Sequence, residues 1–134
     1  MKKNIIITGG LGYIGTELCK IYSGESWNNK ITVIDNRFIS ERVNQLRNWN
    51  IDFVHGDILD KELMNEYLKK ADIVHHLAGI TDVAYVKNDS LGNDDEIIKV
   101  GVEGTRNIID YSKDDVKIIF PSSHVVYEGY NEAL

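Results

Sequence analysis

The sequence has little cysteine, little proline and no long apolar run. A single cysteine, Cys19, excludes a disulfide within the chain and fits a reducing compartment. No apolar stretch approaches the length of a membrane span. Glycines interrupt the apolar start of the chain too early for a signal peptide. From these absences we expect a cytoplasmic protein, in which Cys19 is a packed thiol.

Positive charge is also scarce. The 134 residues include 15 Lys and Arg against 21 Asp and Glu, a net charge of −6. Nucleic acids and anionic membranes attract basic surfaces, so we expect neither as a partner. With 43% apolar and 27% charged residues, the composition is typical of one globular domain with a buried core.

Short β-branched runs alternate with longer amphipathic stretches. Nearly continuous apolar runs, which are typical of strands covered on both faces, occupy residues 4–8, 30–35, 51–56, 71–79 and 116–122. Apolar residues follow helical spacing over residues 12–22, 60–70 and 95–112. Residues 36–50 are ambiguous, and one interpretation is a short helix that ends near the sequence RNWN. This alternation predicts an α/β fold, a doubly wound parallel sheet (Rossmann fold) of five strands in the order 3-2-1-4-5, over residues 1–134.

The apolar spacing also predicts which helix faces are buried. For residues 12–22 the expected face is Ile14, Leu18, Ile21 and Tyr22. For residues 60–70 it is Leu63, Met64, Tyr67 and Leu68, with Asp60 as the N-cap and Lys69 and Lys70 near the C-terminal end. Residues 95–112 carry small residues, Gly101 and Gly104, in the middle of their stripe, so this helix is expected to lie close to the sheet or to a ligand.

The sequence TGGLGYIG, residues 8–15, follows the first predicted strand and opens a helix. This context is typical of a phosphate-binding turn, although a tight turn without a ligand is the alternative. Gly9 and Gly10 are expected to adopt backbone angles closed to other residues. Gly12 would let the backbone approach a pyrophosphate at the helix start, and Gly15 would let the helix pack on the strand.

An acidic residue, Asp35, ends the second predicted strand twenty positions after Gly15. A carboxylate at this point meets the ribose hydroxyls of a bound adenosine, which favours NAD over NADP. Arg37 follows two residues later and is interpreted either as a solvated charge or as a residue that stacks on adenine or attracts a 2′-phosphate.

Six segments in order resemble the extended short-chain dehydrogenases, the NAD-dependent nucleotide-sugar epimerases and dehydratases. They are TGGLGYIG, VIDN, HGDILD, HHLAG, GVEGT and PSSHVVYEG. The resemblance implies hydride transfer at a sugar carbon, with NAD as cofactor and a nucleotide sugar as substrate. It implies that Asp57 accepts from the adenine amino group, that Ile58 packs on the ring and that Ser123 is the active-site serine. The implied cofactor-binding residues are Gly9, Gly12, Tyr13, Ile14, Gly15, Asp35, Asn36, Asp57, Ile58, Leu77, Ala78 and Gly79.

Two departures from the family pattern stand out. Gly101 replaces the asparagine usual in the long helix, and no tyrosine is followed four residues later by lysine. We therefore expect the N-terminal cofactor-binding part of such an enzyme, without its substrate domain and inactive alone. Two alternatives remain: a non-catalytic NAD-binding regulatory module, or an NADPH-linked carbonyl reductase of the same superfamily.

The remaining polar residues give weaker predictions. His75 and His76 are adjacent in a predicted strand and should point to opposite faces, so no metal site is expected. His124 beside Ser123 does not indicate a Ser–His pair, because neighbouring strand side chains diverge. Residues 80–95 form either a substrate-side loop, with Thr81 and Asp82 near the site, or a surface loop. The fifth strand should be an open sheet edge, which predicts a homo-oligomer or a covering partner.

Overall fold

The structure is a computed structural model that describes residues 2–24, 28–80 and 94–123. The predictions for Thr81, Asp82 and His124 lie outside these residues. The elements are, in order, β1 (Asn4–Thr8), α1 (Tyr13–Gly24), β2 (Lys30–Asp35), α2 (Ser40–Asn48), β3 (Asp52–His55), α3 (Lys61–Leu68), β4 (Ile73–His76), α4 (Asp94–Ile98), the π-helical segment η1 (Lys99–Gly104), α5 (Thr105–Tyr111) and β5 (Lys117–Ile119).

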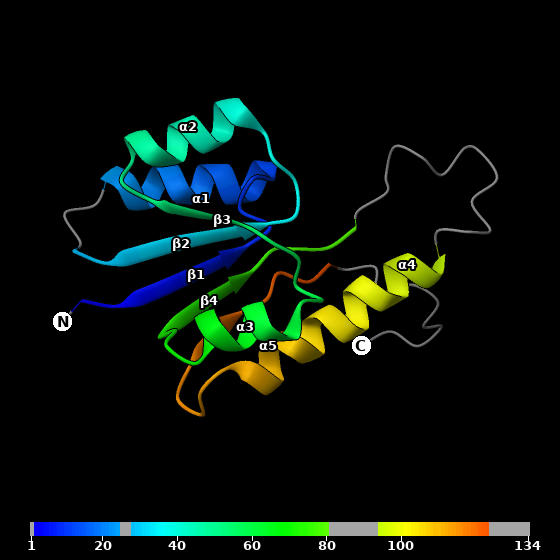
Figure 1. Ribbon diagram of the computed structural model, residues 1–134. Coiled ribbons are helices and arrows are strands. Elements are labelled where there is room, and N and C mark those ends of the chain that lie inside the picture. Colours follow the sequence, from blue (N-terminus) through cyan, green and yellow to red (C-terminus); the bar gives the residue numbers. More distant parts are fainter. Residues whose placement is uncertain (1, 25–27, 81–93, 124–134) are drawn as a thin grey trace, which may run out of the picture.

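All five strands pair in parallel in the order β3-β2-β1-β4-β5, which confirms the predicted doubly wound sheet. Helices α1 and α2 lie on one face of the sheet, and α3 and α5 lie on the other (Figure 1). Side chains of β1 alternate between two cores: Ile5 and Ile7 belong to one and Ile6 to the other. Apolar residues on both faces of β1 explain why it lies in the middle of the sheet.

Helix α3 forms as predicted. The Asp60 carboxylate accepts hydrogen bonds from the backbone N–H groups of Glu62 (3.1 Å) and Leu63 (3.0 Å), so it caps the first turn. Met64 and Leu68, one turn apart, are fully buried. Both the cap and the buried face could be predicted from the sequence, because each depends on residues that are close together in the chain.

The predicted buried face of α1 is wrong in part. Ile14 and Ile21 are 67% and 60% exposed, whereas Gly15 and Cys19 are buried. A Cβ on Gly15 would lie only 2.5 Å from the Gly10 Cα atom, so the helix rests on the glycine turn at this point. This close contact turns the row of Gly15, Cys19 and Tyr22 toward the sheet. Burial raises the pKa of the Cys19 thiol to about 12, as suits a packed thiol.

The long helix of residues 94–111 is interrupted by the π-helical segment η1, which spacing alone did not predict. Its closest approach to the core is at Gly104, where a Cβ would lie 2.3 Å from Ile58 Cδ1. Gly101 is exposed and has no heavy atom within 4 Å of a Cβ position. The predicted close approach is therefore correct for Gly104. At Gly101 no close protein neighbour is present, and the approach of a ligand there stays a prediction.

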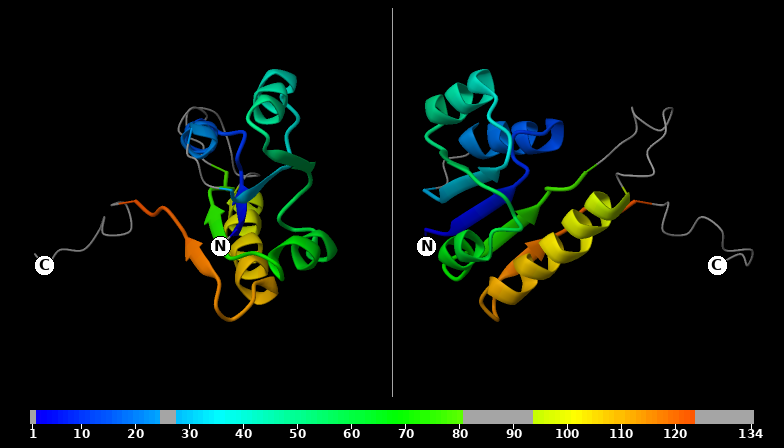
Figure 2. Two further views of the ribbon diagram at one scale, coloured as in Figure 1. Left: turned by 90° about the vertical axis from the view of Figure 1, so that its left-hand side faces the viewer. Right: turned by 45° about the vertical axis from the view of Figure 1, so that its right-hand side comes forward.

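Strand β5 is the edge strand, as predicted, and lies at the outer side of the sheet (Figure 2). Ile118 and Phe120 are 36% and 57% exposed there, and Ile109 on α5 is 59% exposed. The described part of the chain thus leaves apolar side chains uncovered near this edge.

Candidate functional site

The glycine turn joins β1 to α1 and lies against two other strands. Gly9 has a φ of 69°, its N–H donates to Ile34 O at 2.8 Å, and its O accepts from Gly12 N at 3.1 Å. A Cβ on Gly9 would lie 2.6 Å from Ala78 N. Gly10 has no positive φ; it is needed because a Cβ would lie 2.5 Å from a methyl group of Val33. The prediction of unusual backbone angles is therefore correct for Gly9 and wrong for Gly10.

The start of α1 exposes the residues next to this turn. Tyr13 and Ile14 are 85% and 67% exposed. The Thr16 side chain is bonded to the turn, because its Oγ1 donates to Gly12 O at 2.7 Å. Arg42 of α2 donates to Leu11 O and lies over the Tyr13 ring, 5.2 Å from its centroid. Sequence reasoning missed Arg42 because α2 was the element it could least define.

The Asp35 side chain, 3% exposed, is fixed against the glycine turn. Its Oδ2 accepts from Leu11 N at 3.0 Å and its Oδ1 accepts from Arg37 N at 2.9 Å. The Arg37 Nε atom lies 3.6 Å from Oδ1. A carboxylate offers about four acceptor positions, so each oxygen retains capacity for a further hydroxyl donor. This is the chemistry that recognition of a ribose diol requires.

The ends of β2 and β3 meet beside Asp35. Asn36 Nδ2 donates to Asp57 Oδ2 at 3.2 Å, and Leu59 N donates to Asp57 Oδ1 at 2.9 Å. Ile58 is 5% exposed, and its carbonyl accepts from Asn107 Nδ2 of α5 at 2.9 Å. Helix α5 thus fixes the segment in which Asp57 and Ile58 lie, and most of the Ile58 side chain is already covered.

The end of β4 lies on the other side of the glycine turn. Leu77 N donates to Thr8 O at 3.0 Å, and Ala78 N to Thr8 Oγ1 at 3.4 Å. Gly79 is exposed beyond them. Ser123, exposed, follows β5 by four residues. The structure brings together the glycine turn, Asp35, Asn36, Asp57, Leu77 and Ala78 at the carboxyl edge of the sheet.

The adjacent histidines of β4 face opposite sides of the sheet, as predicted. His75 Nε2 lies 2.8 Å from the Tyr22 hydroxyl on α1, and His76 Nε2 lies 3.0 Å from Thr105 Oγ1 on α5. Burial lowers the pKa of both, that of His76 to about 4. Within residues 2–24, 28–80 and 94–123, no group of three or more His, Cys, Asp or Glu residues is arranged to hold a metal ion.

Of the helices in the described ranges, none combines the length and apolar character needed to cross a membrane.

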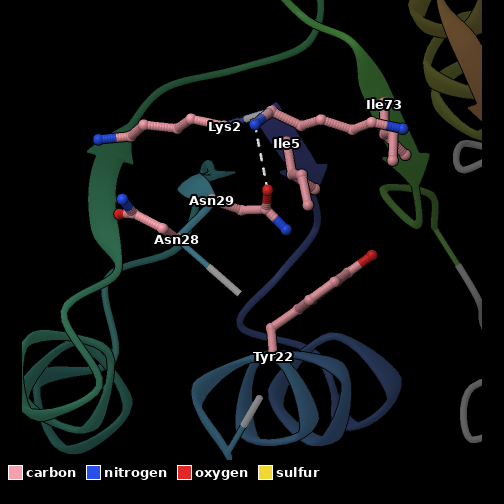
Figure 3. A pocket seen from close by; sticks show the side chains of 7 residues that line it. Lys2, Ile5, Tyr22, Asn28, Asn29 and Ile73 are labelled. Atoms are coloured by element: carbon pink, nitrogen blue, oxygen red, sulfur yellow. Dashed lines mark hydrogen bonds between the residues drawn. The ribbon is translucent and has the colours of Figure 1, made fainter. Parts of the chain in front are cut away.

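A cavity of about 470 Å³ lies at the opposite, amino edge of the sheet. It is lined by Lys2, Lys3, Ile5, Tyr22, Asn28, Asn29 and Ile73 (Figure 3). None of the predicted site residues contributes to it. Because open parallel sheets bind ligands outside the carboxyl ends of their strands, we assign the candidate site to the carboxyl edge.

Comparisons with known proteins identify the family of the chain. A family model described as the 3-beta hydroxysteroid dehydrogenase/isomerase family matches residues 6–133. The UDP-N-acetyl-alpha-D-glucosaminuronate decarboxylase of Bacillus cytotoxicus is 34% identical over 129 residues, which are 95% of this chain and 38% of that protein. The UDP-glucose 4-epimerase of Mycoplasma genitalium is 30% identical over 131 residues, 94% of this chain and 37% of that protein.

A solved structure, UDP-glucose 4-epimerase from Brucella ovis in complex with NAD, is 28% identical, with a TM-score of 0.76 over 98% of this chain and 39% of that one. The chain therefore spans about two fifths of the length of these relatives. The resemblance drawn from the six sequence segments is confirmed. The chain belongs to the 3-beta hydroxysteroid dehydrogenase/isomerase family.

Proposed function

We propose that this chain binds NAD along the carboxyl edge of its sheet, as the cofactor-binding part of an enzyme that acts on a nucleotide sugar. The observation that carries the proposal is the fixed position of Asp35, whose carboxylate is bonded to Leu11 N inside the glycine turn. A ribose-binding carboxylate and a phosphate-binding turn are thereby joined in one rigid unit. The NAD complex of the relative from Brucella ovis supports the same assignment.

The order of the strands orients the cofactor in this proposal. The pyrophosphate lies at the glycine turn and the start of α1, where backbone N–H groups and the helix dipole favour negative charge. The adenosine lies toward β2 and β3, where Asp35 binds its ribose and Asp57 accepts from the adenine. The nicotinamide half then extends over β4, past Leu77, Ala78 and Gly79. Residues Gly12, Tyr13 and Ile14 border the pyrophosphate.

The reaction in this proposal is transient oxidation of a sugar carbon, for which bound NAD supplies the hydride acceptor. Ser123 hydrogen-bonds the sugar oxygen as its charge changes. The names of the relatives support a nucleotide sugar as the substrate class, since a UDP-sugar decarboxylase and a UDP-sugar epimerase both match. The chain contains no Tyr-x-x-x-Lys pair. We therefore propose that these 134 residues alone bind NAD and turn over no nucleotide sugar, because general acid–base catalysis is missing.

Calorimetric titration with NAD and NADP tests cofactor binding. We expect NAD to bind at least about tenfold more tightly, because a 2′-phosphate would be placed against the Asp35 carboxylate. Asp35→Asn should narrow the difference in affinity between NAD and NADP. Asp115→Asn is the control, because Asp115 is an exposed carboxylate that pairs with Lys113 and belongs to no predicted site, and it should leave the difference unchanged. Absence of NAD binding, or tighter binding of NADP, would contradict the proposal; the latter would favour the NADPH-linked reductase.

Turnover is tested separately with the purified chain, its mass confirmed, and a panel of UDP-, dTDP- and GDP-sugars. Product is measured by chromatography while the absorbance of reduced cofactor is followed. We expect cofactor binding without product. Robust conversion of any sugar would contradict the proposed inactivity and would require catalytic groups other than a Tyr–Lys pair.

A further inference from the structure

His76 is bonded at both ring nitrogens to hydroxyl groups from two other elements. Its Nδ1 lies 2.8 Å from Thr8 Oγ1 on β1, and its Nε2 lies 3.0 Å from Thr105 Oγ1 on α5. The histidine is 2% exposed and Thr8 is fully buried. Thr8 and His76 are direct partners in the pairing of β1 with β4, which puts their side chains on the same face. We call these three residues the Thr8–His76–Thr105 link.

The contacts of Thr8 assign the direction of the hydrogen bonds in this link. Thr8 Oγ1 accepts from Ala78 N at 3.4 Å, and because the hydroxyl is fully buried its single hydrogen needs an acceptor, which His76 Nδ1 supplies. An acceptor at Nδ1 leaves the proton on Nε2, which donates to Thr105. Burial lowers the pKa of His76 to about 4, so the ring is neutral near pH 7 and one tautomer satisfies every contact.

The link joins the segments that border the nicotinamide side of the proposed site. Thr8 directly precedes Gly9, whose backbone packs against Ala78: a Cβ there would lie 2.6 Å from Ala78 N. The ring of Phe120, three residues before Ser123, stacks on His76 with centroids 5.5 Å apart. Strands β1 and β4 and helix α5 lie together around this point (Figure 1). His76 therefore contacts the strand ends on both sides of the path proposed for the nicotinamide half.

The adenosine side is held by a different set of contacts. Asp35 is bonded to Leu11 N and Arg37 N, and Asp57 to Asn36 and Leu59. None of these bonds involves a member of the Thr8–His76–Thr105 link. A change in the link should therefore weaken binding of the nicotinamide half of a dinucleotide and leave binding of the adenosine half unchanged.

We propose that His76 is a positioning residue that sets the backbone of Leu77 and Ala78 against the glycine turn, and so supports the nicotinamide half of NAD while the adenosine diphosphate half is bound without it. The inference rests on the proposed function, because it needs a dinucleotide in this orientation. The part of the link that matters for the cofactor is the bond to Thr8, because Thr8 is the threonine of the link that accepts from Ala78 N. The bond to Thr105 anchors α5.

Two substitutions of His76 separate its two bonds. In His76→Asn the amide oxygen can take the place of Nδ1 and accept from Thr8, but the side chain is too short for Thr105. In His76→Gln the amide nitrogen can take the place of Nε2 and reach Thr105, without an acceptor for Thr8. His76→Phe keeps the ring on Phe120 and loses both bonds. NAD and ADP are titrated into each variant by calorimetry, and thermal unfolding is recorded alongside.

We expect the dissociation constant of ADP to stay within about twofold in every variant. The dissociation constant of NAD should rise about 3- to 10-fold in the Gln and Phe variants, the range expected for one lost hydrogen bond, and should be largely restored in the Asn variant. Nitrogen NMR of the wild-type ring should find the proton on Nε2. Equal losses for NAD and ADP, or no loss of NAD affinity in the Gln variant, would overturn the inference.

A second pair of substitutions keeps the test decisive if a ring variant does not fold. Thr8→Val removes the hydroxyl and keeps the side-chain shape, and Thr32→Val is a matched change at a buried β2 threonine outside the link. Only Thr8→Val should weaken NAD relative to ADP. Suppose that the wild-type chain binds both ADP and NAD, and that Thr8→Val lowers the affinity for both ligands by the same factor. The inference would then be wrong and the proposed function would stand. If the wild-type chain bound neither, the proposed function would be wrong, and the inference with it.

Discussion

Replacement of Gly9 by alanine is expected to destabilise the fold strongly. Gly9 has a φ of 69°, and a left-handed backbone costs a residue with a side chain about 1–2 kcal/mol. The added methyl would also lie 2.6 Å from Ala78 N, 2.7 Å from Ala78 Cα and 2.8 Å from the Leu77 carbonyl carbon. These are backbone atoms of the two residues that follow β4, and they cannot rotate away as a side chain could. Such overpacking costs about 1–3 kcal/mol more.

The sum, about 2–5 kcal/mol, is a large part of the roughly 5–15 kcal/mol that holds a domain of this size together. Thermal unfolding followed by circular dichroism should show a decrease in Tm on the order of 10 °C.

Gly101→Ala is the matched control, because Gly101 is helical, exposed and has no heavy atom within 4 Å of a Cβ position. It should leave stability unchanged or raise it by up to about 1 kcal/mol. A Gly9→Ala protein as stable as the wild type would refute the argument, because it would mean that the turn and the end of β4 can separate without loss.

Two further predictions concern acid and the open edge. In the folded protein the pKa of His76 is about 4, below its ordinary 6.5. The stability that the neutral, buried ring contributes to the fold is therefore complete above pH 6.5 and is lost as the pH falls toward 4. Urea unfolding at pH 7 and pH 4.5 should reveal a loss of up to about 3 kcal/mol that His76→Phe largely removes; an unchanged difference in that variant would contradict it. Exposed Ile118, Phe120 and Ile109 should make the chain bind a hydrophobic dye or self-associate, and a monomer without dye binding in sedimentation would count against this.

The elements that depend on neighbouring residues were predictable from the sequence. Asp60 caps α3 through residues two and three positions away, and Met64 and Leu68 repeat at helical spacing. Apolar spacing predicted the wrong buried face for α1. The orientation of this helix is set by the backbone contact between Gly15 and Gly10, which a pattern of apolar residues does not indicate. A pattern of apolar residues assigned Ile14 and Ile21 to the core, and steric contact at a glycine placed them in solvent.

The candidate site divides along the same line. Glycine spacing and the position of Asp35 after β2 identified the phosphate turn and the ribose carboxylate, because in a parallel sheet both requirements act at strand ends. The hydrogen bonds that lock these parts together join residues far apart in the chain: Arg42 to Leu11, Asn107 to Ile58, and Thr105 to His76. Arg42 and Asn107 carry no signal in their local sequence. His76 and Thr105 lie in the HHLAG and GVEGT segments, but no partner was predicted for either, and His76 was considered individually only as a metal ligand. Its buried, neutral ring gains a partner at each nitrogen only when β1, β4 and α5 are assembled, so a role of this kind follows from the fold and cannot be read before it.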